Sequence, residues 1–198
     1  GVVFVEPVSP EDATGDLAEI YDSEAERWGY LPTLAQTFSH NPEAYRAWLQ
    51  LIRVAYDSMD RRRCELATLA AAKALKSTCC SVAHGMFLRD LFYESAEVAR
   101  IAEDRRDAGL DDVDVAIVDF AEKAALDPSS TTQENIDALR MQGLTDGEIF
   151  EVAYAVAARA SFATLIESLG TTAEAQMVET LEPRLLESLS VGRLATQS

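Results

Sequence analysis

Apolar residues recur at spacings of three and four along almost the whole chain, which is the period of an amphipathic helix. Neither period-two alternation nor an Asn-Gly hairpin turn separates the apolar runs, so strands are not expected. The pattern predicts an all-α chain, with helices over residues 15–28, 42–58, 61–74, 78–91, 97–103, 112–126, 132–141 and 146–169, a shorter helix opening at 31–33 and another beyond Pro183.

Capping residues set several of these boundaries. The Asn41-Pro42 pair places a capping asparagine before a proline at the first helical position. Thr145 and Glu148 have the spacing of a capping box, and they precede the most apolar helix of the chain, which Gly170 closes. Because it is so apolar, we expect this helix to be central in the fold.

The chain of 198 residues is long enough to bury one substantial core, and it contains no extended linker, internal repeat or low-complexity segment. We therefore predict a single helical domain over residues 1–198. Its chemistry lies in a segment of about 42–95, and residues of about 183–198 are expected to form a short helix and a frayed tail.

Charge and cysteine usage narrow the possible partners. A formal charge of -17 repels nucleic-acid phosphates and anionic lipids, and it is typical of a solvated acidic surface.

The richest apolar stretch contains Arg159 and Glu167, so no membrane-spanning run of ~18 uncharged apolar residues is expected. The start of the chain lacks the basic flank of a signal peptide. Three cysteines, two of them adjacent, indicate free thiols, and together these features predict a cytoplasmic protein.

Cys80, His84 and Glu65 form the constellation with the most chemical content. His84 follows Cys80 by four residues on a predicted helix, so both side chains lie on one face about one turn apart. If the preceding turn centres near Leu75, an antiparallel hairpin brings Glu65 level with His84 to within roughly 1.5 Å. Glu65 would then orient the imidazole or pass protons through it, as in an activated nucleophile.

The position of Cys80 near the start of this helix is a second feature that favours a reactive thiol. With Ser77 as the N-cap, Cys80 falls in the first turn, where the helix dipole favours a thiolate. The residues alone leave one alternative open, in which Cys80 is a buried structural cysteine beside a core histidine. The other histidine, His40, stands before Asn41-Pro42 and is interpreted as a surface turn residue.

The segment Arg63–His84 resembles the hallmark helix pair of the alkylhydroperoxidase D and carboxymuconolactone decarboxylase superfamily. Glu65, Ser77, Cys80 and His84 have the spacing of its Glu, Cys-x-x-Cys-x-x-x-His signature, with serine in place of the first cysteine. Three further segments are similar to the longer "peroxidase-related" members, namely Gly29–Thr33, Asn41–Glu43 and Phe162–Gly170. The resemblance therefore covers most of residues 10–175.

The resemblance implies an all-α multi-helix bundle with a central antiparallel helix pair that carries the motif. It also implies that Cys80 is the peroxidatic cysteine and that His84 and Glu65 relay protons. Ser77 replaces the resolving cysteine and cannot form a disulfide, so an external thiol or dithiol would have to reduce the Cys80 sulfenate. Cys79 is a secondary candidate, although a disulfide between adjacent cysteines is strained. Core packing is expected for Cys64.

The resemblance favours a thiol-dependent peroxidase that reduces hydrogen peroxide or organic hydroperoxides, with no metal, haem or flavin. A zinc site from Glu65, Cys79, Cys80 and His84 is disfavoured, since adjacent cysteines lack the usual ligand spacing. Two alternatives stay open: a lyase like the decarboxylase branch, in which His84 handles protons, and a non-catalytic helical oligomer with a decayed site. A homo-oligomer, as dimer, trimer or hexamer, is expected in each case. Four of the large aromatic residues on the helices are interpreted as core or subunit-interface positions: Trp28, Trp48, Phe87 and Phe162.

Overall fold

The computed structural model describes residues 3–193, and within that range it is all α-helical, with no strand. In chain order the elements are α1 (Gly15–Trp28), α2 (Thr33–Thr37), α3 (Pro42–Ser58), α4 (Arg61–Ala74), α5 (Thr78–Leu91), α6 (Ser95–Glu103), η1 (Arg105–Asp107), α7 (Asp112–Leu126), η2 (Pro128–Ser130), α8 (Gln133–Met141), α9 (Asp146–Ser168), α10 (Ala175–Val178) and α11 (Pro183–Leu189). The predicted fold class is confirmed, and the predicted bounds of the long helices agree with these to within two residues.

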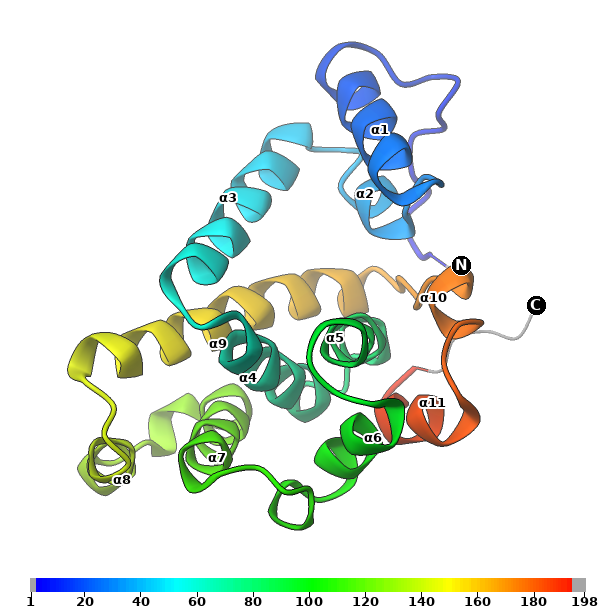
Figure 1. Ribbon diagram of the computed structural model, residues 1–198. Coiled ribbons are helices and arrows are strands. Elements are labelled where there is room, and N and C mark those ends of the chain that lie inside the picture. Colours follow the sequence, from blue (N-terminus) through cyan, green and yellow to red (C-terminus); the bar gives the residue numbers. More distant parts are fainter. Residues whose placement is uncertain (1–2, 194–198) are drawn as a thin grey trace.

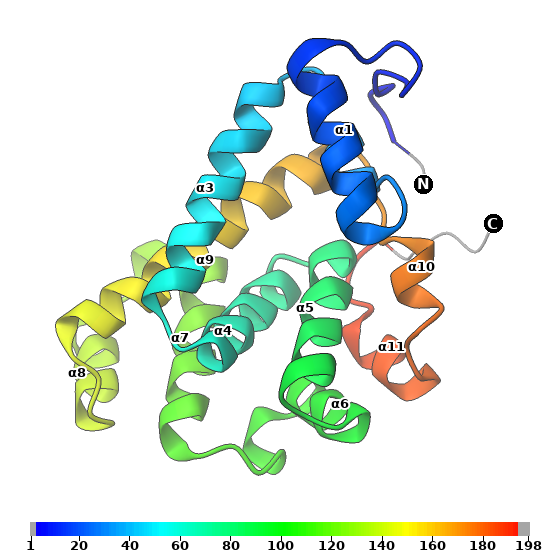
Figure 2. The same cartoon turned by 45° about the horizontal axis from the view of Figure 1, so that its top comes forward.

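Helix α9 lies at the centre of the molecule, as its composition predicts. It packs against α3, α4 and α7. In Figure 1 it crosses the middle of the view, with α1 to α3 on one side and α4, α6 and α7 on the other. In Figure 2, after a 45° turn, α3 crosses α9 in the view, while α1 stays on one side of it and α4, α6 and α7 on the other. Helices α4 and α5 form an antiparallel pair beside it. This pair carries the cysteine motif.

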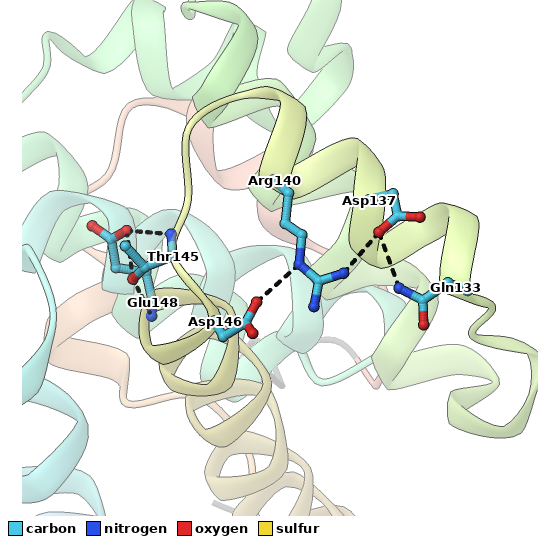
Figure 3. Close-up of polar contacts among 6 residues, drawn as sticks. All are labelled: Gln133, Asp137, Arg140, Thr145, Asp146 and Glu148. Atoms are coloured by element: carbon cyan, nitrogen blue, oxygen red, sulfur yellow. Dashed lines mark hydrogen bonds and ion pairs between the residues drawn. The ribbon is translucent and has the colours of Figure 1, made fainter.

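Capping interactions define where α9 begins (Figure 3). Thr145 Oγ1 accepts from the Glu148 N–H at 3.2 Å, and Glu148 Oε2 accepts from the Thr145 N–H at 2.7 Å, so the predicted capping box is present. Arg140 at the end of α8 donates to Asp146 at 2.9 Å and to Asp137 at 2.8 Å. The short loop between α8 and α9 is therefore fixed by the Arg140 ion pairs on the α8 side and by the capping box on the α9 side.

The apolar character of α9 is higher than the sequence reasoning allowed. Among the described residues it is the one helix that is long and apolar enough, by length and composition, to cross a membrane, with a mean hydropathy of 1.5 over its richest 18-residue window. Half of that window is buried inside the protein. The charges of Arg159 and Glu167 do not prevent this, because alanine, phenylalanine and isoleucine dominate the average hydropathy. Packing between α3, α4 and α7 explains the composition.

Helix α5 stands between two hydrophobic clusters. Val82 and Leu88 belong to the larger cluster, which α4, α7 and the C-terminal helices also form. Cys80 instead belongs to a cluster built from α1, α2, α3 and the distal part of α9. The thiol therefore faces the N-terminal helices, while most of α5 is buried in the main core. Alanines of α4, several of them fully buried, allow this close packing.

The C-terminal segment packs across the start of α5, which corrects the expectation of a frayed tail for residues 190–193. The N–H groups of Val191 and Gly192 donate to Thr78 Oγ1 at 3.2 and 3.1 Å. A Cβ at Gly192 would lie 1.8 Å from the Lys76 carbonyl oxygen, so only glycine fits there. The remainder of the predicted tail, residues 194–198, lies outside the described residues.

Candidate active site

Glu65 on α4 and His84 on α5 meet across the helix pair. His84 Nδ1 lies 2.5 Å from Glu65 Oε2, and both side chains are buried, at 3% and 0% exposure. A tight turn at Leu75 and Lys76 joins the helices, with Lys76 in the left-handed region at φ 56°. The predicted hairpin register is therefore confirmed. The roles of the two residues in catalysis stay predictions.

Arg61 completes this polar group from one turn earlier on α4. Its Nε donates to Glu65 Oε1 at 2.7 Å, so each oxygen of the Glu65 carboxylate has a partner. The Arg61 guanidinium lies over the Tyr56 ring, with Cζ 3.8 Å from the ring centroid. Arg61 is half-exposed and connects the buried carboxylate to the surface.

These contacts determine the charge states. Burial alone would raise the pKa of Glu65, but the attraction and hydrogen bonds of His84 and Arg61 outweigh it, and the pKa of Glu65 is lowered. Burial, and next the positive charge of Arg159, lower the pKa of His84. The two directions together favour a carboxylate beside a neutral imidazole, and Arg61 and the Nδ1 contact still stabilise the Glu65 charge when the ring is uncharged. A neutral ring that donates Nδ1–H to Glu65 leaves Nε2 as a proton acceptor.

Cys80 lies in the first turn of α5, one turn before His84 and on the same face. Ser77 Oγ accepts from the Cys80 N–H at 3.3 Å, which confirms Ser77 as the N-cap. The same hydroxyl donates to Glu167 Oε1 of α9 at 2.7 Å. Cys80 is 1% exposed, so the thiol is enclosed by protein.

Arg159 is the residue of this site that sequence reasoning missed. Its Nη1 lies 3.5 Å from Cys80 Sγ, and its side chain enters from the middle of α9 with 3% exposure. Within residues 3–193 the structure records no ion pair between Arg159 and a carboxylate, and no hydrogen bond joins Cys80 to His84. The thiol's recorded partner is therefore a buried cation. The sequence does contain one indication of this role, because Arg159 is the one basic residue between Val152 and Ser168 in an otherwise apolar helix.

Aromatic rings surround the Arg159 guanidinium. Its Cζ lies 5.0 Å from the ring centroid of Phe162 and 5.9 Å from that of Trp48, and these two rings stack at 4.2 Å. Phe38 stacks on Phe162 at 6.0 Å. The charge is thus enclosed by aromatic rings and a thiol, and the side chain is almost fully buried.

The other two cysteines have different surroundings. Burial raises the pKa of Cys64 to about 11, and Cys64 packs with Ala55 and Ala155, which confirms its place in the core. The pKa of Cys79 is raised well above its usual value by burial and by the neighbouring Cys80. All three cysteines are free. In the described part of the chain, no three His, Cys, Asp or Glu side chains are arranged to hold a metal ion.

Outside the motif, His40 lies at the surface as predicted, and the four predicted aromatic positions are buried or partly buried. His40 is exposed and its Nε2 lies 2.8 Å from the Glu6 carbonyl oxygen. Phe162 is buried, and Phe87 packs edge-on to His84 at 5.6 Å. Trp28 lies 6.4 Å from Phe87 between ring centroids.

Comparison with family models gives no match, and neither does comparison with curated protein sequences. Solved structures do match. A peroxidase-related protein with an alkylhydroperoxidase AhpD core from Ralstonia eutropha JMP134 has a TM-score of 0.80 at 19% identity, over 89% of this chain and 95% of its own. A peroxidase-related protein from Silicibacter sp. TM1040 has a TM-score of 0.74 at 18% identity, over 88% and 90%. The fold is alkylhydroperoxidase D-like.

The debrominase Bmp8 has the same fold. Its cysteine-to-alanine variant in complex with 2,3,4-tribromopyrrole has a TM-score of 0.76 at 16% identity, over 93% of this chain and 96% of its own. The alkylhydroperoxidase D-like fold thus includes proteins described as peroxidase-related and one described as a debrominase. At these identities the likeness establishes the fold alone.

Proposed function

We propose that this protein is a thiol-dependent peroxidase in which Cys80 reduces hydrogen peroxide or an organic hydroperoxide. The observation that carries the proposal is the buried Arg159 guanidinium 3.5 Å from Cys80 Sγ. A buried cation without a carboxylate partner is costly, and a thiolate at Cys80 supplies the opposite charge. The hydrogen-bonded Glu65–His84 pair, one turn along α5, provides the proton acceptor.

The oxidation step uses these groups in turn. His84 Nε2 takes the thiol proton while Glu65 holds Nδ1–H. The Cys80 thiolate attacks one peroxide oxygen, so that an S–O bond forms and the O–O bond breaks. The leaving oxygen takes the proton from His84 and departs as water or alcohol. Sulfur is oxidised by two electrons to sulfenic acid, and the peroxide is reduced by two.

Reduction of the sulfenic acid requires thiols from outside the chain, because Ser77 occupies the position of a resolving cysteine. A first external thiol condenses with the sulfenic acid, which releases water and forms a mixed disulfide. A second thiol attacks this disulfide, restores the Cys80 thiol and leaves as the oxidised disulfide. A dithiol reductant performs both steps.

A second candidate is thiol-dependent dehalogenation of an aromatic substrate. The aromatic side chains around Cys80 and Arg159 favour it, and the debrominase Bmp8 has the same fold. This activity would use the same cysteine nucleophile and the same external thiols. It differs from the first candidate in the bond that is broken, and product analysis separates the two.

The test is trapping of a sulfenic acid. The protein is treated with stoichiometric hydrogen peroxide and a dimedone-type probe, and the adduct is located by mass spectrometry. We expect it on Cys80, and we expect Cys80→Ser to lose both the adduct and peroxide turnover. A Cys80→Ser variant that keeps wild-type turnover would exclude the thiol mechanism and favour a lyase in which His84 acts alone.

A further inference from the structure

Within residues 3–193, three buried side-chain polar atoms have no hydrogen-bond partner, and two of them belong to the groups around the thiol. These two are Trp48 Nε1 and Arg159 Nε, and the third is Ser81 Oγ, in the residue after Cys80. Arg159 contacts Cys80 Sγ through Nη1, and its Cζ lies 5.9 Å from the Trp48 ring centroid. Trp48 also packs against the hydrophobic cluster that contains Cys80, so both unpartnered N–H donors belong to side chains around the thiol.

Unpartnered buried donors are rare in folded proteins because each one loses its hydration without compensation, at about 1–3 kcal/mol. Trp28 shows the ordinary case, since its Nε1 donates to Glu24 Oε2 at 3.0 Å. Trp48 Nε1 is buried and has no such acceptor. Two unpartnered donors around the same thiol are typical of a binding site for a ligand that has oxygen acceptors.

We propose that Trp48 Nε1 and the Arg159 guanidinium together form the receptor for the peroxide group, and that they bind the oxygen that leaves. This proposal rests on the peroxidase function and adds the residues that recognise the substrate. A peroxide presents two adjacent oxygens, both of them acceptors. As Cys80 attacks one, negative charge develops on the other, where a cationic donor and a neutral N–H stabilise it.

If Trp48 and Arg159 bind the peroxide group, substitutions there should slow the reaction of Cys80 with peroxide but not its alkylation. Iodoacetamide also consumes the Cys80 thiolate, but iodide leaves without needing N–H donors. Trp48→Phe keeps the ring and removes only the donor. We expect its second-order rate constant for sulfenic acid formation with hydrogen peroxide to fall about tenfold, the effect of one hydrogen bond to a charged transition state. We expect its alkylation rate to stay within about twofold of wild type.

Two further variants complete the experiment. Trp28→Phe is the matched control, because the Trp28 N–H already has a partner outside the site, and it should leave both rates unchanged. Arg159→Lys keeps the positive charge without the Nε–H, so it should slow peroxide oxidation more than alkylation. Circular dichroism and thermal melts confirm that each variant is folded, and Arg159→Lys remains informative if Trp48→Phe does not fold.

The outcomes separate the two proposals. If wild type forms the Cys80 sulfenic acid but Trp48→Phe and Arg159→Lys alter both reactions equally, or neither, the receptor is wrong and the peroxidase stands. If wild type forms no sulfenic acid, the peroxidase function fails and the receptor fails with it. A selective loss of the peroxide rate in both variants supports the receptor.

Discussion

Ser77 performs two structural tasks at the start of α5, where the signature that this segment resembles would have its first cysteine. Its hydroxyl caps α5 at the Cys80 N–H and donates to Glu167 of α9. A cysteine there would lie three residues before Cys80 at the helix start, the spacing of the Cys-x-x-Cys signature. The serine thus caps α5 and ties it to α9, and in the proposed mechanism it leaves a Cys80 sulfenate without an internal partner.

Ser77→Cys should therefore give the protein an internal disulfide with Cys80. We expect wild type to inactivate under excess peroxide by over-oxidation of the sulfenate, and the variant to complete more turnovers before inactivation with a dithiol reductant. The cost should be about 1 kcal/mol for the weakened cap, with a similar amount for the lost Glu167 contact. Turnover number and the denaturation midpoint measure the two effects.

Ser77→Ala is the control, because it removes the same hydroxyl without adding a thiol. It should match the stability loss of Ser77→Cys and show no protection. Failure of Ser77→Cys to form a disulfide with Cys80 under mild oxidation would show that the signature's resolving geometry does not carry over to this chain.

The candidate site was predictable from sequence as far as local geometry reaches. The pairing of Glu65 with His84 followed from helix rise and a short turn, and the Ser77 cap followed from residue type. Arg159 did not follow, because it lies 79 residues from Cys80 and its position depends on how α9 packs against the α4–α5 pair. The orphaned N–H of Trp48 depends on the same packing.

The α4–α5 pair should make stability depend on pH through its buried charges. The folded-state pKa values of Glu65 and His84 are both lowered, so in acid the unfolded state binds more protons than the folded one. The contribution of His84 is complete above its ordinary pKa of 6.5 and is lost as the pH falls below that value. The contribution of Glu65 is lost at lower pH, below its ordinary 4.5.

We therefore expect the urea denaturation midpoint of wild type to fall between about pH 7.5 and about pH 5.5. In His84→Gln, which cannot titrate there, the fall should be smaller. His40→Gln is the matched variant, since His40 is exposed and outside the site. Equal pH slopes for wild type and His84→Gln would contradict the assignment of a neutral buried imidazole.

Asp114 joins α7 to α4 through a buried carboxylate. Arg62 Nη1 donates to its Oδ2 at 2.5 Å and Arg63 Nε to its Oδ1 at 3.0 Å, and the Asp114 side chain is 2% exposed. Asp114→Ala should lower the free energy of unfolding by about 2 kcal/mol, less than for a fully buried pair because both arginines reach solvent. Asp112→Ala, an exposed neighbour in the same first turn, should cost under about 0.5 kcal/mol. Similar losses for the two variants would reject the link.

The sequence predicted those helices that have both a capping residue and an apolar period. The long helices have both signals. The four residues of α10 and the three of each 3₁₀ helix span too little chain for any period to be read. Helix α6 begins two residues earlier than predicted, because Glu94 and Glu97 form a capping box that lacks the usual serine or threonine.

For the whole molecule, the formal charge of -17 is the dominant electrostatic property. Ion pairs involve many of the arginines, but acidic residues outnumber basic ones by two to one, 34 to 17. Self-repulsion of the unpaired carboxylates opposes the compact state. Individual exposed ion pairs contribute only about 0–1 kcal/mol, so their screening by salt does not offset relief of the repulsion.

We therefore expect the melting temperature to rise with sodium chloride, by about 2–4 °C for each kcal/mol of repulsion removed. The rise should level off by about 0.3 M, where the screening length is already well below 10 Å. Differential scanning calorimetry over a salt series measures this, with potassium chloride as a control for ion-specific effects. A melting temperature that is flat or falls below about 0.3 M salt would contradict the prediction.

The placement of Arg159 against Cys80 also has a consequence for biosynthesis. The ribosome adds about 5–20 residues per second. The 79 residues between Cys80 and Arg159 therefore correspond to a delay on the order of 4–16 s at this rate. The C-terminal segment that covers the start of α5 follows later still. Throughout this interval Cys80 lacks its cationic partner, so a chain released before α9 is complete carries Cys80, His84 and Glu65 without the buried guanidinium beside the thiol.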